Sequence, residues 1–232
     1  GQLMKRKVLS EELSASTYPG RGIVVGRSED GRYAVAAYFI MGRSANSRNR
    51  VFAVRNGEVF TEPFDPSKVQ DPSLIIYAAV RQFGKTLIVT NGNQTDTICE
   101  YLEKGLSFQD ALKTREYEPD EPNYTPRISG IIHADGSYEI EILKKEEDEC
   151  CREWYSYPGE EGVGHFISTY DHDGDPLPSF SGKPIRIAIE DDAEAFVRGL
   201  WESLNPENRI SLYVRFKKTE TIINRYGGTE NE

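Results

Sequence analysis

The stretch VFAVRNGEVFT at residues 51–61 places Asn56-Gly57 between two short runs of alternating character. Asn-Gly favours a type I′ turn, because both central residues of that turn need a positive φ. The pattern therefore predicts a β-hairpin with strands at 51–55 and 58–61. Strands joined by such short turns are antiparallel, since parallel strands need long crossover connections.

Other apolar runs are separated by equally short polar turns. Three further pairs of strands are predicted, at 22–26 with 33–41, 74–80 with 86–90, and 127–133 with 137–144. Additional strands are predicted at 151–157, 164–170, 184–190 and 210–217. Antiparallel pairing is thus expected to dominate the whole chain.

Helices are predicted at 94–104, at 107–115 from the capping box Ser107-Phe-Gln-Asp110, and at 192–204. Apolar residues of the last recur on one face, as in a helix laid on a sheet, at Ala193, Phe196, Val197, Leu200, Trp201 and Leu204. Many strands with few helices predict an α+β fold. No repeat or linker divides the chain, so we expect an N-terminal arm or short helix at 1–17 and a single domain at 18–232.

Composition limits the class of protein. The 232 residues are 38% hydrophobic with 11% aromatic residues, which indicates a packed core and not a disordered chain. No apolar run approaches the roughly 18 residues of a membrane span, and no apolar core of a signal peptide is evident, so we expect no membrane association and a cytoplasmic location. The three cysteines form neither a disulfide framework nor a zinc pattern.

The charge is unevenly distributed. The net charge of −10 disfavours nucleic acid as a partner. Residues 1–55 nevertheless carry ten Lys or Arg against four Asp or Glu, a local charge of +6, which leaves −16 for the remainder. Arginines gathered in an acidic protein suit either a small anion or a solvated basic face.

Polar side chains concentrate in four segments beside predicted strands. These are Tyr18-Pro-Gly-Arg21, Gly42 to Arg50, Thr90 to Thr95, and Glu118 to Arg127. Arginines bind phosphate through two parallel hydrogen bonds, a helix N-terminus attracts anions, and carboxylates transfer protons. Each segment also has an ordinary interpretation as a turn, a helix cap or a solvated loop.

A metal site receives little support. The segment Asp171-His-Asp-Gly-Asp175 offers oxygen ligands, but its glycine does not occupy the position that an EF-hand loop requires. A hairpin turn is the favoured interpretation, and we expect no metal.

Taken together, the polar segments resemble the archaeal-type IMP cyclohydrolase family, enzymes that close the purine ring in the last step of IMP synthesis. The resemblance rests on Tyr18-Pro-Gly-Arg21 with Gly26, Arg43-Ser44, Asn49-Arg50, Asn91-Gly92 with Thr95, Glu118, Asp120, Thr125 to Ile128, and Gly162 to Tyr170. It implies a four-layered αββα sandwich like that of the N-terminal-nucleophile hydrolases, without an autoprocessed nucleophile.

The resemblance also implies a substrate and no cofactor. The substrate would be 5-formamidoimidazole-4-carboxamide ribotide (formyl-AICAR), and the partners purine ribonucleoside monophosphates, with a homo-oligomer left open. Arg21 and Arg50, supported by Arg43, would bind the phosphate, although the spacing leaves open which of Arg43, Arg48 and Arg50 meets it.

The remaining roles follow from the chemistry of ring closure. Glu118 or Asp120 would accept the amide proton, Arg127 would orient the formyl oxygen, and Tyr77 or Tyr124 would stack on the base or donate a proton. Substrate binding is expected of Tyr18, Arg21, Arg43, Asn49, Arg50, Asn91 and Thr125. Two other functions stay open: a nucleotide-binding protein without turnover, and an amide hydrolase with an N-terminal nucleophile.

Overall fold

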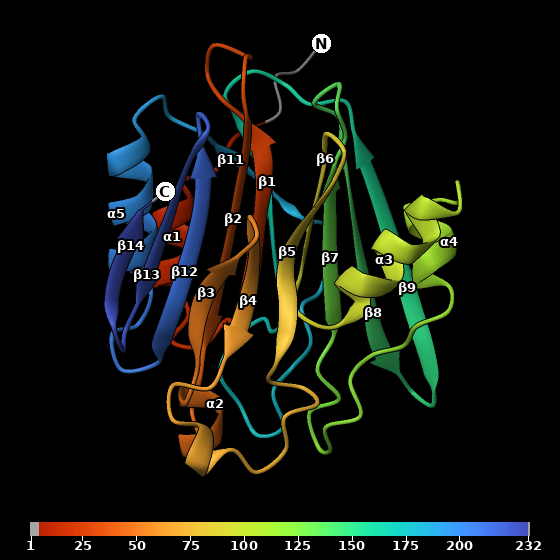
Figure 1. The fold of residues 1–232 in the computed structure, drawn as a ribbon, viewed down its shortest axis with the longest axis vertical. Helices are drawn as coiled ribbons and strands as arrows, with labels where there is room; N and C mark the ends of the chain where they lie inside the picture. The colour runs from red at the N-terminus through yellow and green to blue at the C-terminus, as the bar shows by residue number, and fades with distance from the viewer. Residues whose placement is uncertain (1–4, 232) are drawn as a thin grey trace.

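Two seven-stranded antiparallel sheets lie face to face (Figure 1). The structure is a computed structural model that describes residues 5–231. The first sheet has the order β11 (Ile185–Ala188), β10 (Val163–Ser168), β1 (Arg21–Arg27), β2 (Ala34–Met41), β12 (Arg209–Phe216), β13 (Thr219–Asn224) and β14 (Gly228–Asn231). The second has the order β3 (Val51–Arg55), β4 (Glu58–Glu62), β5 (Tyr77–Phe83), β6 (Thr86–Thr90), β7 (Arg127–Ile132), β8 (Tyr138–Glu146) and β9 (Glu149–Tyr157).

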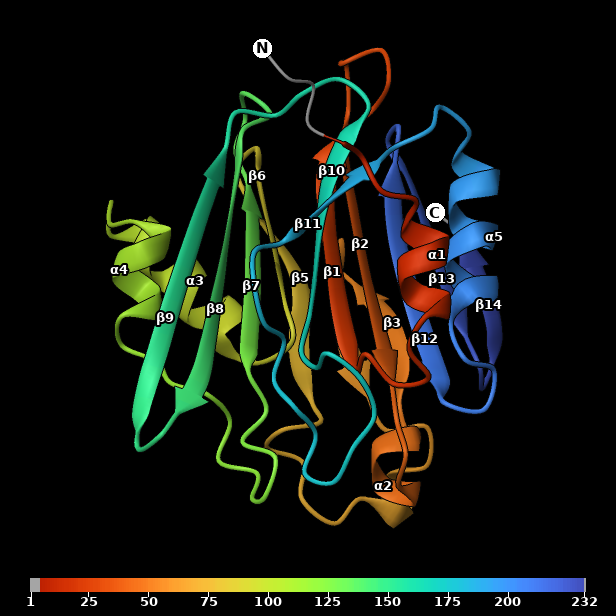
Figure 2. The same ribbon diagram turned by 180° about the vertical axis from the view of Figure 1, so that it is seen from behind.

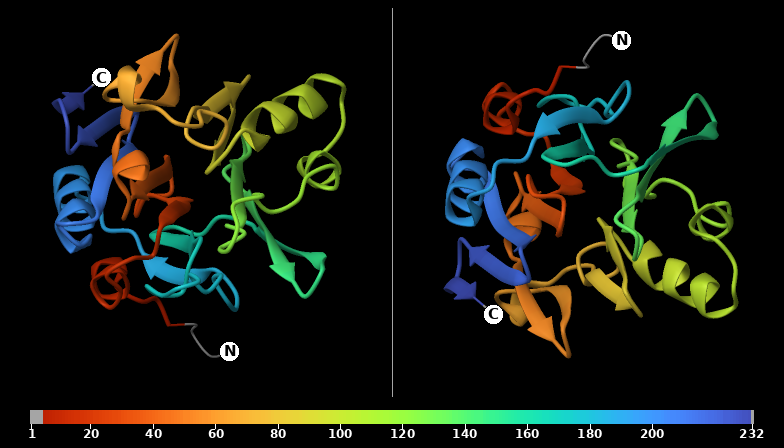
Figure 3. Two further views of the ribbon diagram at one scale, coloured as in Figure 1. Left: turned by 90° about the horizontal axis from the view of Figure 1, so that it is seen from below. Right: turned by 90° about the horizontal axis from the view of Figure 1, so that it is seen from above.

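Helices cover the two outer faces. α1 (Leu9–Ser14) and α5 (Ala193–Ser203) pack on the first sheet, and α3 (Gln94–Glu103) and α4 (Phe108–Leu112) pack on the second. Figure 3 shows the resulting order of layers, helix, sheet, sheet and helix, from the two ends of the sandwich. The predicted α+β fold is therefore confirmed.

The sandwich forms because the central strands are apolar on both faces. In β1, Ile23 and Val25 point into the core between the sheets, whereas Val24 joins the core beneath α1 and α5. Side chains alternate between the faces of a strand, so a continuous apolar run satisfies both layers at once.

The hairpin at 51–61 has the expected turn. Asn56 and Gly57 adopt φ values of 55° and 77°, and β3 pairs with β4 through them. Two short elements were not expected, the helix α2 (Ala45–Arg48) and the 3-10 helix η1 (Pro66–Lys68).

Two strand predictions need correction. The strand predicted at 74–80 begins only at Tyr77, because Ile75 closes a turn with its N–H on the Pro72 carbonyl. Strands β13 and β14 were missed because Lys217 and Lys218 form the preceding turn, at φ values of 50° and 68°. Lysine carries no turn signal, since positive φ is ordinarily adopted by Gly, Asn or Asp.

Antiparallel topology brings five distant segments to one end of the sandwich. Strands β1, β5 and β7 begin there, and β2 and β10 end there, as Figure 2 shows near α2. All four polar segments singled out in the sequence lie in or beside the connections at this end.

Candidate functional site

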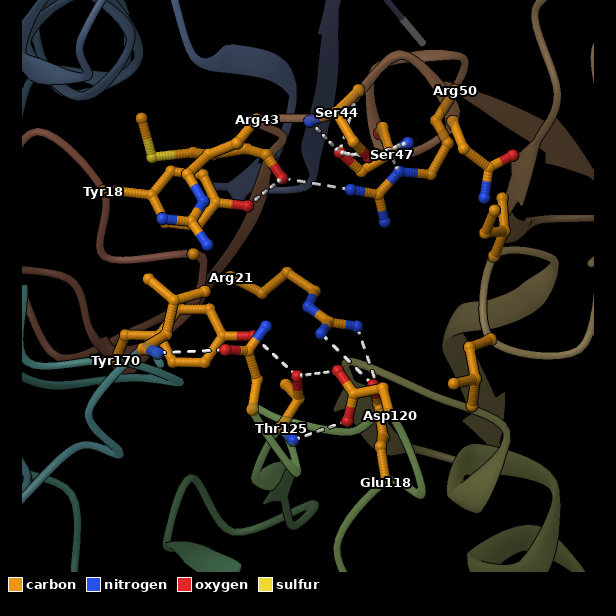
Figure 4. A pocket seen from close by; sticks show the side chains of 17 residues that line it. Tyr18, Arg21, Arg43, Ser44, Ser47, Arg50, Glu118, Asp120, Thr125 and Tyr170 are labelled. Carbon is orange, nitrogen blue, oxygen red and sulfur yellow. Dashed lines mark hydrogen bonds and ion pairs between the residues drawn. The ribbon is translucent and has the colours of Figure 1, made fainter. Parts of the chain in front are cut away.

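A cavity of about 470 Å³ opens at the end of the sandwich near α2 (Figure 4). This volume lies in the usual range for small-ligand sites. Its wall is made by Tyr18, Gly20, Arg21, Met41, Arg43, Ser44, Asn46, Ser47, Arg50, Leu74, Ile75, Glu118, Asp120, Asn123, Thr125, Tyr170 and Leu177. Seven of these were expected as site residues from the sequence.

One side of the cavity is held by an arginine without a carboxylate partner. Arg50 is 4% exposed, and its guanidinium donates to the Ser47 carbonyl at 2.6 Å and the Met41 carbonyl at 3.0 Å. Within residues 5–231 it forms no ion pair. A buried charge without a counter-charge is costly, so an anion in the cavity would stabilise it.

Arg43 lies at the rim of the same side. It pairs with Asp173 at 2.7 Å, and it stands over the Tyr18 ring with 5.1 Å between the guanidinium carbon and the ring centroid. Tyr18 in turn stacks on Tyr170 at 5.9 Å. Burial raises the pKa of Tyr18, and this effect is larger than the lowering caused by the positive charges of the three cavity arginines. The Tyr18 hydroxyl therefore stays protonated at neutral pH.

Arg21 stands between the two sides of the cavity, as Figure 4 shows. Its two terminal nitrogens meet the two Glu118 oxygens at 3.1 and 3.4 Å, and one also donates to the Asn91 carbonyl at 3.3 Å. Desolvation is the largest single influence and acts to lower the Arg21 pKa, but Glu118 and three neighbouring tyrosines together outweigh it, and the pKa is raised. Burial raises the pKa of Glu118, which Arg21 opposes. The two-point geometry is that of an ionised pair.

The opposite wall carries a directed chain of hydroxyls. The Tyr170 and Thr125 hydroxyls are 2.6 Å apart, and the Thr125 hydroxyl donates to Asp120. Since Thr125 has a single hydroxyl proton, Tyr170 must donate to it. The Thr125 N–H also donates to Asp120 at 2.6 Å. Burial raises the pKa of Tyr170 to about 12 although Arg21 opposes it.

Two predicted residues lie behind the cavity and not in its wall. The Asn91 side chain is fully buried and forms hydrogen bonds with the backbone of Pro126 and Ile128. The backbone carbonyl of Asn91 accepts a hydrogen bond from the Arg21 guanidinium. Arg127 donates to the Glu116 carbonyl at 2.8 Å and to Gln94 at 3.1 Å. Burial lowers the pKa of Arg127. Both hold the loop that carries Glu118 and Asp120.

Three other candidate side chains are also outside the cavity wall. Tyr77 is buried between the sheets with its hydroxyl 2.5 Å from that of Tyr38. Asn49 exchanges two hydrogen bonds with the backbone of Asp65, at 2.8 and 2.7 Å. Tyr124 donates to Glu121. Their side chains are committed to folding contacts.

Several wall residues were not expected to act from the sequence. Tyr170 is the main one, and its signal was its place at the end of the Gly162–Tyr170 segment quoted for the resemblance. Ser44 and Ser47 cap α2 reciprocally, with the Ser47 N–H on the Ser44 hydroxyl at 3.1 Å. Leu74, Ile75 and Leu177 add apolar surface.

Among residues 5–231 the structure has neither a cluster of metal-ligating side chains nor a helix that could span a membrane. Across residues 5–231 no three His, Cys, Asp or Glu side chains gather as metal ligands would. Asp173, from the segment weighed as a cation site, instead pairs with Arg43. In the same residues no helix has the length and apolar character to cross a membrane.

Comparison with known proteins agrees with this arrangement. The family model described as IMP cyclohydrolase-like protein matches residues 18–221, which include the entire cavity wall. The chain belongs to the IMP cyclohydrolase-like family. The resemblance noted in the sequence is thereby confirmed.

Family relatives include proteins named IMP cyclohydrolase in three archaea. The protein of Methanopyrus kandleri is 39% identical over 49% of this chain and 58% of its own length. That of Methanococcus aeolicus is 30% identical over 66% of this chain and 74% of its own. That of Halobacterium salinarum is 33% identical over 55% and 63%. Two of these three alignments therefore cover less than two thirds of the relative's length.

Proposed function

We propose that this chain is an IMP cyclohydrolase, which converts formyl-AICAR to IMP with loss of water in purine biosynthesis. One observation carries the proposal beyond family membership. The buried Arg50 lines the cavity and has no acidic partner within residues 5–231, as expected of a side chain that binds a phosphate group of the substrate. The curated relatives carry the same name.

The reaction needs two proton movements. In the first step the carboxamide nitrogen attacks the formyl carbon, a C–N bond forms, and one amide proton is removed while the formyl oxygen gains one. In the second the C–O bond breaks, the oxygen leaves as water, and the formamido N–H proton is lost as a C=N bond forms. Both reacting groups belong to one ring, so the protein mainly orients them and moves protons.

The phosphate would occupy the side of the cavity with Arg50, Arg43 and the α2 serines. Arg50 uses two of its five N–H groups on carbonyls, which leaves three for an anion. Arg43 is partly exposed and already pairs with Asp173, so we assign it a supporting role at the rim. This arrangement favours Arg50 over Arg43 and Arg48, since Arg48 does not line the cavity.

The reacting groups would face the opposite wall. Asp120 is partly exposed whereas Glu118 is 2% exposed and paired with Arg21, so we assign proton acceptance to Asp120. A proton taken by Asp120 can return through the Thr125 hydroxyl to Tyr170, which would donate to the departing oxygen. A Tyr170 pKa of about 12 keeps that hydroxyl protonated until a strongly basic oxygen develops.

The direct test is turnover of formyl-AICAR by purified protein, followed by the absorbance of IMP. We expect IMP formation, and we expect Asp120→Asn to lower kcat by roughly 10²–10⁴-fold, as loss of a general base does. Glu121→Gln is the matched control, since that acid is one residue away and outside the cavity wall. Binding of IMP without turnover would support the non-catalytic alternative and would refute the proposal.

A further inference from the structure

A second cavity lies at the other end of the sandwich. Its volume is about 560 Å³, and its wall comes from four hairpin turns, β1–β2 and β12–β13 of one sheet and β5–β6 and β7–β8 of the other. These turns meet at the upper end of Figure 1, away from α2. Arg21 lines the first cavity and Arg27 lines the second, and these two residues are the two ends of β1. Since a strand rises about 3.3 Å per residue, the two cavities lie roughly 20 Å apart.

The wall of this second cavity is basic. It contains five Arg or Lys side chains and no Asp or Glu, namely Arg27, Arg32, Lys85, Arg215 and Lys218. Among residues 5–231 only Arg215 of the five is ion-paired, with Glu220 at 3.9 Å. Such a concentration is unusual in a chain of net charge −10.

Other charged groups face the same region. Glu139 is paired with His133 of the wall at 2.5 Å, and Asp30 interacts electrostatically with Arg32. Glu220 already faces Arg215, at 3.9 Å. A fourth acid, Asp135, lies between two wall residues of the β7–β8 turn, with its carboxylate bound to Ser137. None of the four acids lines the cavity, so its five cations leave an excess of positive charge there.

The fold positions several of these cations. Arg27 donates to the Gly31 carbonyl at 2.7 Å and to the Asp135 carbonyl at 3.3 Å. A Cβ at Gly136 would lie 2.4 Å from an Arg27 nitrogen, so that glycine makes room for the guanidinium. Lys218 holds a positive φ at its turn and stands over the Tyr33 ring at 5.8 Å. Arg32 and Lys85 have exposed side chains without a hydrogen bond or ion pair to the described chain.

The number and spread of the cations indicate the kind of ligand. A single phosphate group is satisfied by two or three donors on one side, whereas these five come from three of the four turns around one opening. Several anionic groups on one small molecule would meet them together. The apolar floor of Leu87 and Ile132 limits water around the contacts and strengthens them.

We propose that this cavity is a second anion site, separate from the candidate active site, that binds a small oligophosphate such as the di- or triphosphate moiety of a metabolite. The side chains of Arg32 and Lys85 contact the outer phosphates, and Arg27 contacts the phosphate nearest the floor. This site uses none of the residues of the first cavity.

Tripolyphosphate is the probe that tests the proposal, by isothermal titration calorimetry of the full chain in metal-free buffer. We expect one tripolyphosphate per chain, weakened roughly tenfold by Lys85→Glu and by Arg32→Glu, since each loses a charge-assisted contact. Neither substitution removes a side-chain hydrogen bond or an ion pair within residues 5–231, and Arg32→Glu additionally loses the electrostatic attraction between Arg32 and Asp30.

Two controls make the test specific. Lys183→Glu reverses an exposed lysine outside both cavities, and Arg50→Met alters the first cavity only. Both should bind tripolyphosphate as the unaltered chain does. Absence of binding at millimolar probe, equal weakening by Lys183→Glu, loss of binding in Arg50→Met alone, or equal affinity for orthophosphate would each overturn the proposal.

Discussion

Replacing Arg50 by Met separates ligand binding from folding. The guanidinium is 4% exposed and bonds to the Ser47 and Met41 carbonyls at 2.6 and 3.0 Å. Met keeps most of the apolar volume and removes the charge. Charge-assisted contacts to a phosphate contribute about 2–3 kcal/mol, so affinity for IMP should fall roughly 30- to 150-fold.

Stability should change much less than affinity. Arg50→Met loses two hydrogen bonds to neutral carbonyls, each contributing about 1 kcal/mol, but it also removes the desolvation cost of a buried unpaired charge. These effects oppose each other, so we expect the free energy of unfolding to stay within about 1 kcal/mol. Isothermal titration calorimetry with IMP and urea unfolding measure the two quantities.

Arg48→Met is the matched control for this experiment. Arg48 also donates to the protein, to the Gly42 carbonyl at 2.9 Å and to Asn208 at 3.0 Å, but it does not line the cavity. Its loss should lower stability and leave IMP affinity unchanged. The reasoning is refuted if Arg50→Met binds IMP within twofold of the unaltered chain, or if Arg48→Met weakens binding equally.

Three further predictions concern the other wall and the core. Tyr170→Phe should lower kcat at least tenfold with little change in IMP affinity, whereas Tyr124→Phe should change neither, as steady-state kinetics would show. Tyr77→Phe should lower the free energy of unfolding in urea by about 1 kcal/mol and leave kcat unchanged, because it removes only the hydrogen bond to Tyr38. A large loss of kcat would instead show that Tyr77 takes part in catalysis. Burial raises the pKa of Glu141 from 4.5 to about 7, so the native state binds the proton more tightly and stability falls as the pH rises through this window. Glu141→Gln should therefore stabilise the protein by about 2 kcal/mol more at pH 8 than at pH 5, and equal effects at both pH values would exclude this cause.

Most of the strand pairs were predictable because their signals are local. Asn56-Gly57 specifies its hairpin through two φ values, and the apolar face of 193–203 specifies a helix on a sheet. Where local signals were absent the prediction failed. Lys217 and Lys218 form a turn that only the pairing of the flanking strands imposes.

The candidate site was only partly predictable, because a residue's neighbours in space decide what its side chain does. Arg50 lines the cavity, whereas the adjacent Asn49 turns away to bind the Asp65 backbone. Tyr77 was a reasonable acid on chemical grounds, but its strand directs it between the sheets to Tyr38. Tyr170, two residues beyond the end of β10, was not expected in the wall.

The amino-acid sequence alone determined the strand and helix types, the antiparallel pairing and the four polar segments, since turn chemistry and side-chain periodicity act over a few residues. Only the tertiary structure decided which polar groups share a cavity. Glu118 lies 97 residues from Arg21 and Tyr170 lies 45 from Thr125, yet both pairs are in contact. Such meetings depend on how two sheets align their strand ends, and no local property of the chain specifies that alignment.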